Sequence, residues 1–166
     1  WRVAYCKVFY PLAYYCAYFS IRADAFDYEK MAMGRERLEY YLDIYKAKKA
    51  DGTIEKTELD EYKDMRIVQE MYARGYEFTP IDIYKAKARS FQIIDGKIMP
   101  SFKVVSKIGE SAGESIEIAA RGGKFLSKDD LRQRAKIGQT VIDKLSELKL
   151  LDGMAESNQL SLFDVL

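Results

Sequence analysis

Apolar residues recur at helical spacing in a segment that begins near residue 27, and this pattern predicts a long amphipathic helix. The apolar positions are Met31, Leu38, Leu42 and Tyr45. Residues three, four or seven positions apart lie on one face of a helix, where they can pack against a second element. Asp27 is a favourable N-cap and Asp51-Gly52 a favourable stop, so we expect one helix from Asp27 to about Lys49.

A second segment with the same period follows directly and predicts a packing partner for this helix. Thr57 and Asp60 have the spacing of a capping box, and Gly75 supplies a stop. The apolar face between them consists of Met65, Val68, Met71 and Tyr72. Together the two segments predict an antiparallel helical hairpin.

Residues 1–22 form an aromatic-rich segment with helical character on both sides of Pro11. Proline starts a helix well and interrupts one badly. The tyrosines and phenylalanines predict deep burial, and we expect Cys6 and Cys16 to be buried, reduced thiols of a cytosolic protein rather than a disulfide. Because Lys7 and Pro11 break the apolar run, a core helix is favoured over a membrane span.

The period changes from helical to extended around Asp95-Gly96. Residues 91–94 and 97–99 are largely apolar or β-branched and flank this pair. An Asp-Gly pair between two such runs is a strong signal for a tight β-hairpin. Pro100 is expected to end the hairpin.

The chain has no histidine and only two cysteines, which excludes several kinds of active site. A His-based triad, an imidazole base and a Cys-His zinc site all need residues that are absent. The acid pairs Asp129-Asp130 and Asp24 with Asp27 could hold Mg²⁺, but each sits where the first turn of a helix favours negative charge. With no glycine-rich phosphate loop either, we expect no catalytic residue, metal site or cofactor in this chain.

The region after the β-hairpin contains a pair of units in which an apolar residue and a glycine precede a helix. The first unit consists of residues 102–106, a turn at 107–112 and a helix at 113–120. In the second, Ser127 caps a helix at 128–134, followed by a turn at 136–140 and a helix at 141–148. This is the pattern of a helix-hairpin-helix module, whose turn directs free backbone N–H groups at a phosphate and ignores base sequence.

Candidate DNA-binding residues follow from these turns and from the basic side chains near them. The turn residues are Lys107, Ile108, Gly109, Glu110 and Ser111 in the first unit and Lys136, Ile137, Gly138, Gln139 and Thr140 in the second. The added basic residues are Arg121, Lys124, Lys128 and Arg134. A local excess of basic charge favours DNA. A glycine C-cap between packed helices with a solvated charged face explains the same spacing, and spacing alone leaves both interpretations open.

The end of the chain carries a candidate linear motif, Gln159-Leu160-Ser161-Leu162-Phe163. Its amide can make one directed hydrogen bond, and its apolar side chains can anchor in pockets of a partner protein. A tail that packs on its own domain is the alternative.

These residues resemble the PolC-type alpha subunit of bacterial DNA polymerase III. Residues 159–163 match the family's sliding-clamp-binding peptide, and residues 11–24 are similar to its fingers segment. Residues 81–85 resemble the entry to its duplex-binding domain, and residues 124–131 the link between its helix-hairpin-helix units. The start on Trp1, without a methionine, is expected of a piece cut from a longer protein.

The resemblance implies a mainly α fold with a small β-hairpin, in which a helical fingers remnant precedes a tandem helix-hairpin-helix domain. The implied parts are the end of the fingers (1–76), a duplex-binding domain (77–153) and a clamp-binding tail (154–166). The implied partners are double-stranded DNA, the sliding clamp and the remainder of a cytoplasmic polymerase chain, with no membrane. The catalytic aspartates, and the Mg²⁺ expected for the parent polymerase, belong to a palm domain outside this chain.

Departures from the family and other function classes stay open at this point. The first turn has Lys107-Ile108-Gly109 where the family commonly has Gly-x-Gly, so it is either altered or gains a phosphate contact from the lysine. Asp164-Val165-Leu166 extend beyond the usual end and could weaken or extend clamp binding. The alternatives are a helix-hairpin-helix repair or recombination protein that binds the clamp, and a helical interaction domain. Residues 11–24 argue against both.

Overall fold

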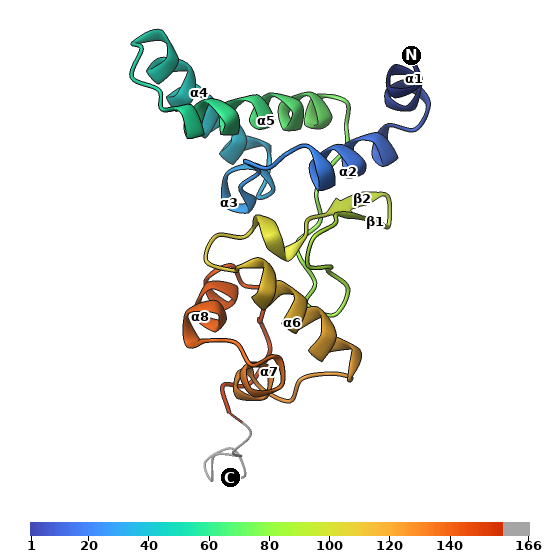
Figure 1. Ribbon diagram of the computed structural model, residues 1–166, viewed down its shortest axis with the longest axis vertical. Helices are drawn as coiled ribbons and strands as arrows, with labels where there is room; N and C mark the ends of the chain where they lie inside the picture. Colours follow the sequence, from blue (N-terminus) through green and yellow to red (C-terminus); the bar gives the residue numbers. More distant parts are fainter. Residues whose placement is uncertain (158–166) are drawn as a thin grey trace.

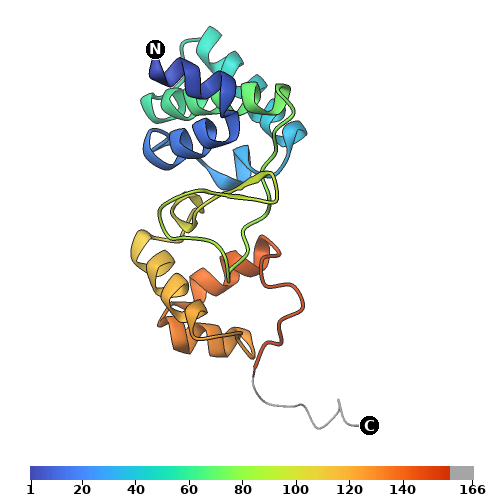
Figure 2. The same cartoon turned by 90° about the vertical axis from the view of Figure 1, so that its right-hand side faces the viewer.

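The computed structural model describes residues 1–157 and consists mainly of helices, with one small β-hairpin, as predicted. We call α1–α5 the helical unit and the segment from η1 to α8 the C-terminal unit. The hairpin and the extended segments beside it lie between the two units (Figures 1 and 2). The elements are α1 (Arg2–Phe9), α2 (Pro11–Ile21), α3 (Tyr28–Met31), α4 (Arg35–Ala50), α5 (Lys56–Ala73), β1 (Gln92–Ile94), β2 (Lys97–Met99), η1 (Phe102–Val104), α6 (Glu110–Arg121), α7 (Lys128–Ala135) and α8 (Gln139–Glu147).

Pro11 is the first residue of α2, and the helices on both sides of it form as predicted. Deep burial is confirmed only for α2, where Tyr15 and Phe19 reach the core. It is wrong for α1, which has no buried residue: it packs mainly on α2, and Lys7 forms an ion pair with Glu70 of α5. Trp1 is 96% exposed.

Both cysteines are free, but their predicted burial is wrong for Cys6, which is exposed on α1. Cys16 is half-buried, and burial raises the pKa of its thiol. Among the residues that the structure describes, no helix combines the length and the apolar character needed to cross a bilayer.

The single long helix expected from Asp27 is two helices. Asp27 is an N-cap as predicted, since its carboxylate accepts a hydrogen bond from the Lys30 amide at 3.0 Å, but it caps the short α3. Gly34 has a φ of +110°, a conformation that side chains disfavour, and it redirects the chain before α4 begins. The apolar face of Met31, Leu38, Leu42 and Tyr45 is nevertheless buried.

Helix α5 begins earlier than the sequence predicted. Its N-cap is Glu55, whose amide donates to the Glu58 carboxylate at 3.1 Å, so the capping box at Thr57 and Asp60 was wrong. Gly75, at a φ of +86°, follows the C-cap and ends the helix as expected. Helices α4 and α5 pack along each other as the predicted helical hairpin (Figure 1).

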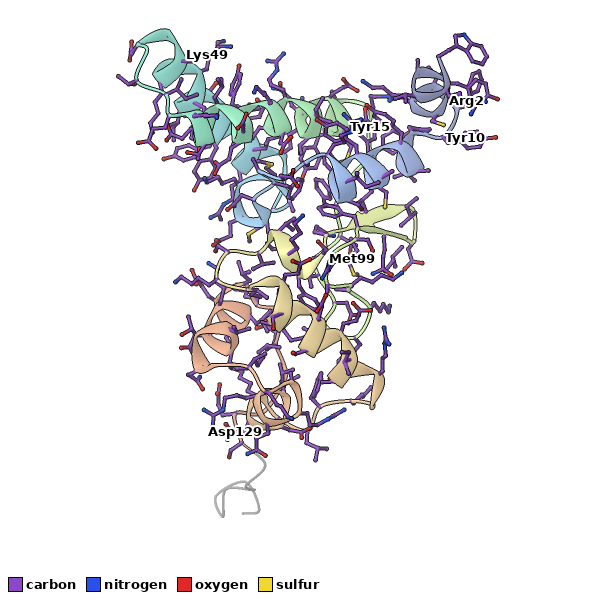
Figure 3. All side chains as sticks on the ribbon, viewed as in Figure 1. Arg2, Tyr10, Tyr15, Lys49, Met99 and Asp129 are labelled. Atoms are coloured by element: carbon purple, nitrogen blue, oxygen red, sulfur yellow. The ribbon has the colours of Figure 1, made fainter. Side chains whose placement is uncertain are left out.

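The β-hairpin forms with the predicted turn. Ile94 pairs with Lys97 across Asp95 and Gly96, both of which have positive φ, at 51° and 75°. One hydrophobic core runs from the helical unit through the hairpin region to the C-terminal unit. At the junction, the ring of Phe26 lies 5.1 Å from that of Phe91 and 5.5 Å from that of Phe78. Met99 marks this junction in Figure 3.

A buried carboxyl group makes the stability of the helical unit depend on pH. Asp64 on α5 is only 6% exposed, and burial raises its pKa to about 6, although the Ala25 amide donates to it at 3.2 Å. The charges of Asp24 and Asp60 raise the pKa further, and Lys63 opposes them. Above pH 6 the folded protein must therefore hold a charge that burial disfavours.

We expect Asp64→Asn to raise the free energy of unfolding at pH 7.5 by about 2 kcal/mol, with little gain at pH 5. A carboxyl group whose pKa is raised by folding destabilises the folded protein at a pH above the folded pKa. This cost decreases as the pH falls toward the unfolded pKa, because the folded protein then binds a proton and no longer holds a buried charge. The free energy of unfolding of the wild type should therefore rise between pH 7.5 and pH 5. Denaturant unfolding at both pH values measures the effect. Asp43→Asn, an exposed acid on α4, is the control. Equal effects of Asp64→Asn at both pH values would contradict a buried charge as the cause.

Candidate nucleic-acid interface

The first turn, residues 107–109, connects η1 to α6. Lys107 has a φ of +66°, Ile108 is buried, and Gly109 is the extended N-cap of α6. Helix α6 begins at Glu110, so the predicted start at residue 113 was too late. Gly113 instead lies inside the helix against η1, where a Cβ would come within 2.9 Å of the Phe102 Cβ.

The second turn, residues 136–138, connects α7 to α8. Ser127 caps α7 as predicted, accepting a hydrogen bond from the Asp130 amide at 3.1 Å. Lys136 has a φ of +52°, Ile137 is buried, and Gly138 is the extended N-cap of α8. Helix α8 begins at Gln139, before the predicted position 141.

The two turns share one backbone path, although they lie in different parts of the sequence. In each, a lysine adopts the left-handed conformation, which costs a residue other than glycine roughly 1 kcal/mol or more. In each, a buried isoleucine anchors the turn and the glycine has a ψ near 160°, at 163° for Gly109 and 162° for Gly138. Lys107 therefore gives the first turn the same backbone path that Lys136 gives the second.

Each glycine leaves the N-terminus of the following helix open. Neither α6 nor α8 has a side-chain cap, and a Cβ on Gly109 or Gly138 would meet nothing within 4 Å. The first residues of both helices are exposed, next to an exposed lysine, and the first amides of a helix have no partner within it. Helix N-termini of this kind attract anions through their N–H groups and the helix dipole.

The electrostatic surroundings of the two turns differ. Glu110 lies in the first turn of α6 and pairs with Arg89 at 2.6 Å, whereas the first turn of α8 contains no acid. A carboxylate at the helix N-terminus competes with a phosphate for the same positive potential. The second turn is therefore the more favourable anion site.

The exposed basic residues near the turns divide into free and paired groups. Lys107, Lys124 and Lys136 are exposed and form no ion pair within residues 1–157. Arg121 pairs with Glu117 at 2.9 Å. Lys128 is half-buried and pairs with Glu156. The free ammonium groups are the ones available to a ligand.

Arg134 has a different environment from the other predicted contacts. Its guanidinium donates to the carbonyl oxygens of Ala119, Gly123 and Lys124 at 2.7, 3.1 and 3.0 Å. It also lies over the Phe125 ring, 4.5 Å from the centroid. These contacts fasten the end of α6 and the following loop to α7, so we assign Arg134 to the fold rather than to the surface.

Two basic residues with clear roles escaped the sequence analysis. Arg89 reaches Glu110 and Glu114 on α6 from a segment far away in sequence, and no spacing pattern indicates this contact. Lys144 is 5% exposed and lies on the apolar face of α8 with Val141, Leu145 and Leu148. Its spacing from these apolar residues could have predicted that Lys144 is buried and needs an acidic partner from another part of the chain.

The remaining candidate residues are the acid pair Asp129-Asp130 and the C-terminal tail. Asp129 and Asp130 occupy the first turn of α7, at the far end of the C-terminal unit, where Figure 3 labels Asp129. In the described part of the chain, no group of side chains has the composition of a metal site. The predicted clamp-binding residues Gln159–Phe163 lie outside the described residues.

Comparisons with known proteins agree with this geometry. A family model for a helix-hairpin-helix motif matches residues 75–160. The DNA polymerase III PolC-type of Streptococcus pneumoniae serotype 2 (strain D39) is 40% identical over 165 residues, and that of Streptococcus suis (strain 98HAH33) is 42% identical over 163 residues. These alignments cover 99% and 98% of this chain but only 11% of each relative, so the chain spans about one ninth of their length.

Proposed function

Because the chain belongs to the helix-hairpin-helix family, we propose that it is the portion of a PolC-type DNA polymerase III that holds duplex DNA. The observation that carries the proposal is the shared path of the two turns, each of which opens a helix N-terminus beside an exposed left-handed lysine. Similarity to PolC-type polymerases over 99% of the chain favours a polymerase over a repair or recombination protein.

In the proposed complex each turn holds one backbone phosphate. The amides at the start of α6 and α8 donate to the phosphate oxygens, and Lys107 and Lys136 add charge-assisted contacts. Lys124, exposed in the loop after α6, adds a further positive charge to the C-terminal unit. Since these groups reach phosphates and not base edges, binding ignores base sequence and weakens with salt.

We assign the chemical reaction to the remainder of the polymerase chain. The parent protein would add deoxynucleotides with Mg²⁺ held by aspartates outside this segment, in the cytoplasm of a bacterium. The exposed apolar side chains of α1 supply a surface on which that remainder can pack, since Trp1, Tyr5 and Phe9 form a row of neighbouring rings at its surface. Gln159–Phe163 would bind the sliding clamp.

A titration of the chain with labelled duplex DNA tests the proposal. We expect Lys136→Glu with Gly138→Val to weaken binding by about tenfold or more, because the new carboxylate repels phosphate and the new side chain blocks its approach. A Cβ at position 138 meets nothing within 4 Å, and the backbone there has no positive φ, so folding should be retained within about 1 kcal/mol. Binding of wild type should fall steeply with salt and hardly vary with sequence.

Lys149→Glu is the matched control, because Lys149 is also exposed and left-handed, at a φ of +59°, but follows α8 instead of preceding it. It changes the net charge equally and should weaken binding much less. Equal losses for both variants, or strong dependence on base sequence, would refute a phosphate site at the second turn.

A further inference from the structure

Glu29, on α3, makes polar contacts with both helix-hairpin-helix units. Its Oε2 atom accepts a hydrogen bond from the Ser106 hydroxyl at 3.2 Å and lies 2.9 Å from the Lys144 Nζ atom. Ser106 immediately precedes Lys107 of the first turn, and Lys144 lies on α8, the helix that the second turn opens. A single carboxylate from the helical unit therefore bridges the two helix-hairpin-helix units of the C-terminal unit.

The contact with Lys144 is an enclosed one. The side chain of Lys144 is 5% exposed and that of Glu29 24%. A buried ammonium needs a partner to offset its lost hydration. Burial alone would lower the pKa of Lys144 and raise that of Glu29, but their mutual hydrogen bond and charges reverse both shifts. Both groups are thus held in their charged forms.

Helix α3, which carries Glu29, is itself held in place by several contacts. Asp27 caps the helix, and Met31 at its end is fully buried. The Tyr28 hydroxyl accepts a hydrogen bond from the Ile81 amide at 3.4 Å, which ties α3 to the segment that enters the C-terminal unit. With its own helix anchored, Glu29 can fix the groups it contacts.

We propose that Glu29 is a positioning residue for duplex binding, which sets the placement of the first turn relative to α8 so that both turns meet phosphates of one duplex together. This inference rests on the proposed function. It predicts that loss of the carboxylate weakens binding, whereas electrostatics alone predict the opposite, since removing a negative charge favours association with DNA.

The test uses Glu29→Gln in the full chain, titrated with labelled duplex DNA at a temperature where thermal melts show the protein folded. Glu147→Gln is the matched control, because Glu147 also pairs with Lys144, at 3.3 Å, but contacts neither α3 nor the first turn. We expect Glu29→Gln to weaken binding by roughly three- to thirtyfold, as couplings within a protein commonly do. Glu147→Gln should leave binding unchanged or strengthen it slightly.

A second arm separates positioning from a general loss of structure. In a Lys136→Glu background the second turn no longer contributes, so Glu29→Gln should then cost less than twofold. An equal cost in both backgrounds, or unchanged binding by Glu29→Gln while Lys136→Glu still weakens it, would overturn the positioning role alone. If wild type does not bind duplex, or if Lys136→Glu has no effect, the proposed function itself fails.

Discussion

Replacing Arg134 by methionine should lower the free energy of unfolding by about 3 kcal/mol, which corresponds to a fall in melting temperature of about 10 °C for a chain of this size. The guanidinium donates to three carbonyl oxygens at the junction of α6 and α7, and methionine can replace its volume but none of its donors. The stacking on Phe125 is also lost. Thermal and denaturant unfolding of both proteins measure the effect.

Arg132→Met is the matched control for this prediction. Arg132 lies two residues earlier on α7 and is exposed, with a contact of 4.0 Å to Asp129 and a long hydrogen bond of 3.4 Å to the Gln139 side chain. Its loss should change the free energy of unfolding by less than about 0.5 kcal/mol. If the two variants melted alike and Arg134→Met instead lost only DNA affinity, the guanidinium would belong to the binding surface after all.

The β-hairpin and the start of α7 could be predicted because their signals are local. Asp95 and Gly96 both adopt positive φ, which their residue types permit at low cost, and the flanking strands then pair in the only register that the turn allows. Ser127 likewise caps a helix through its own side chain. In both cases the local structure is determined by the residues within it and not by distant contacts.

Helix boundaries were less predictable because several residues compete for one cap. Gly34 breaks the expected long helix, and an apolar pattern that continues across it gives no sign of the break. At the start of α5, Glu55 and Glu58 form the capping box that Thr57 and Asp60 also offered. Acceptors of similar quality two residues apart differ in free energy by less than sequence rules resolve.

The roles of individual charges depended on distant contacts and could not be read from the sequence. Arg134 was assigned to DNA on the basis of its charge, but the carbonyl groups that it meets belong to α6 and the following loop. Glu29 and Lys144 are brought together only by the packing of α3 against the C-terminal unit. A net count of basic residues therefore located the region of the candidate surface but not its members.

The lysines of the two turns show how local strain and proposed function are related. Glycine would adopt the left-handed conformation of Lys107 and Lys136 without a steric penalty. A lysine at each position instead accepts that penalty and places a charge next to the open helix N-terminus, where a phosphate is expected to bind. The strain is offset by the anchoring of the neighbouring isoleucines, Ile108 and Ile137, in the core.

Among the predicted effects on binding affinity, we expect the largest from replacing the apolar residues of the C-terminal tail. We expect Leu162→Ala with Phe163→Ala to weaken binding of a bacterial sliding clamp by about a hundredfold or more, because each apolar anchor typically contributes about 2 kcal/mol. Gln159→Ala should cost less, about 1 kcal/mol, since it removes one hydrogen bond. Titration of the clamp with the chain and its variants gives the affinities.

The control for the tail is Val165→Ala with Leu166→Ala, which removes apolar atoms just beyond the motif and should change clamp affinity much less. Duplex binding and the melting temperature should be the same in all of these variants, because a linear peptide makes its contacts in the partner and not in its own domain. The alternative, a tail that packs on its own domain, predicts the reverse. A Leu162/Phe163 double variant that melts much earlier and still binds the clamp as tightly as wild type would show that these side chains belong to the core, and the clamp proposal would be withdrawn.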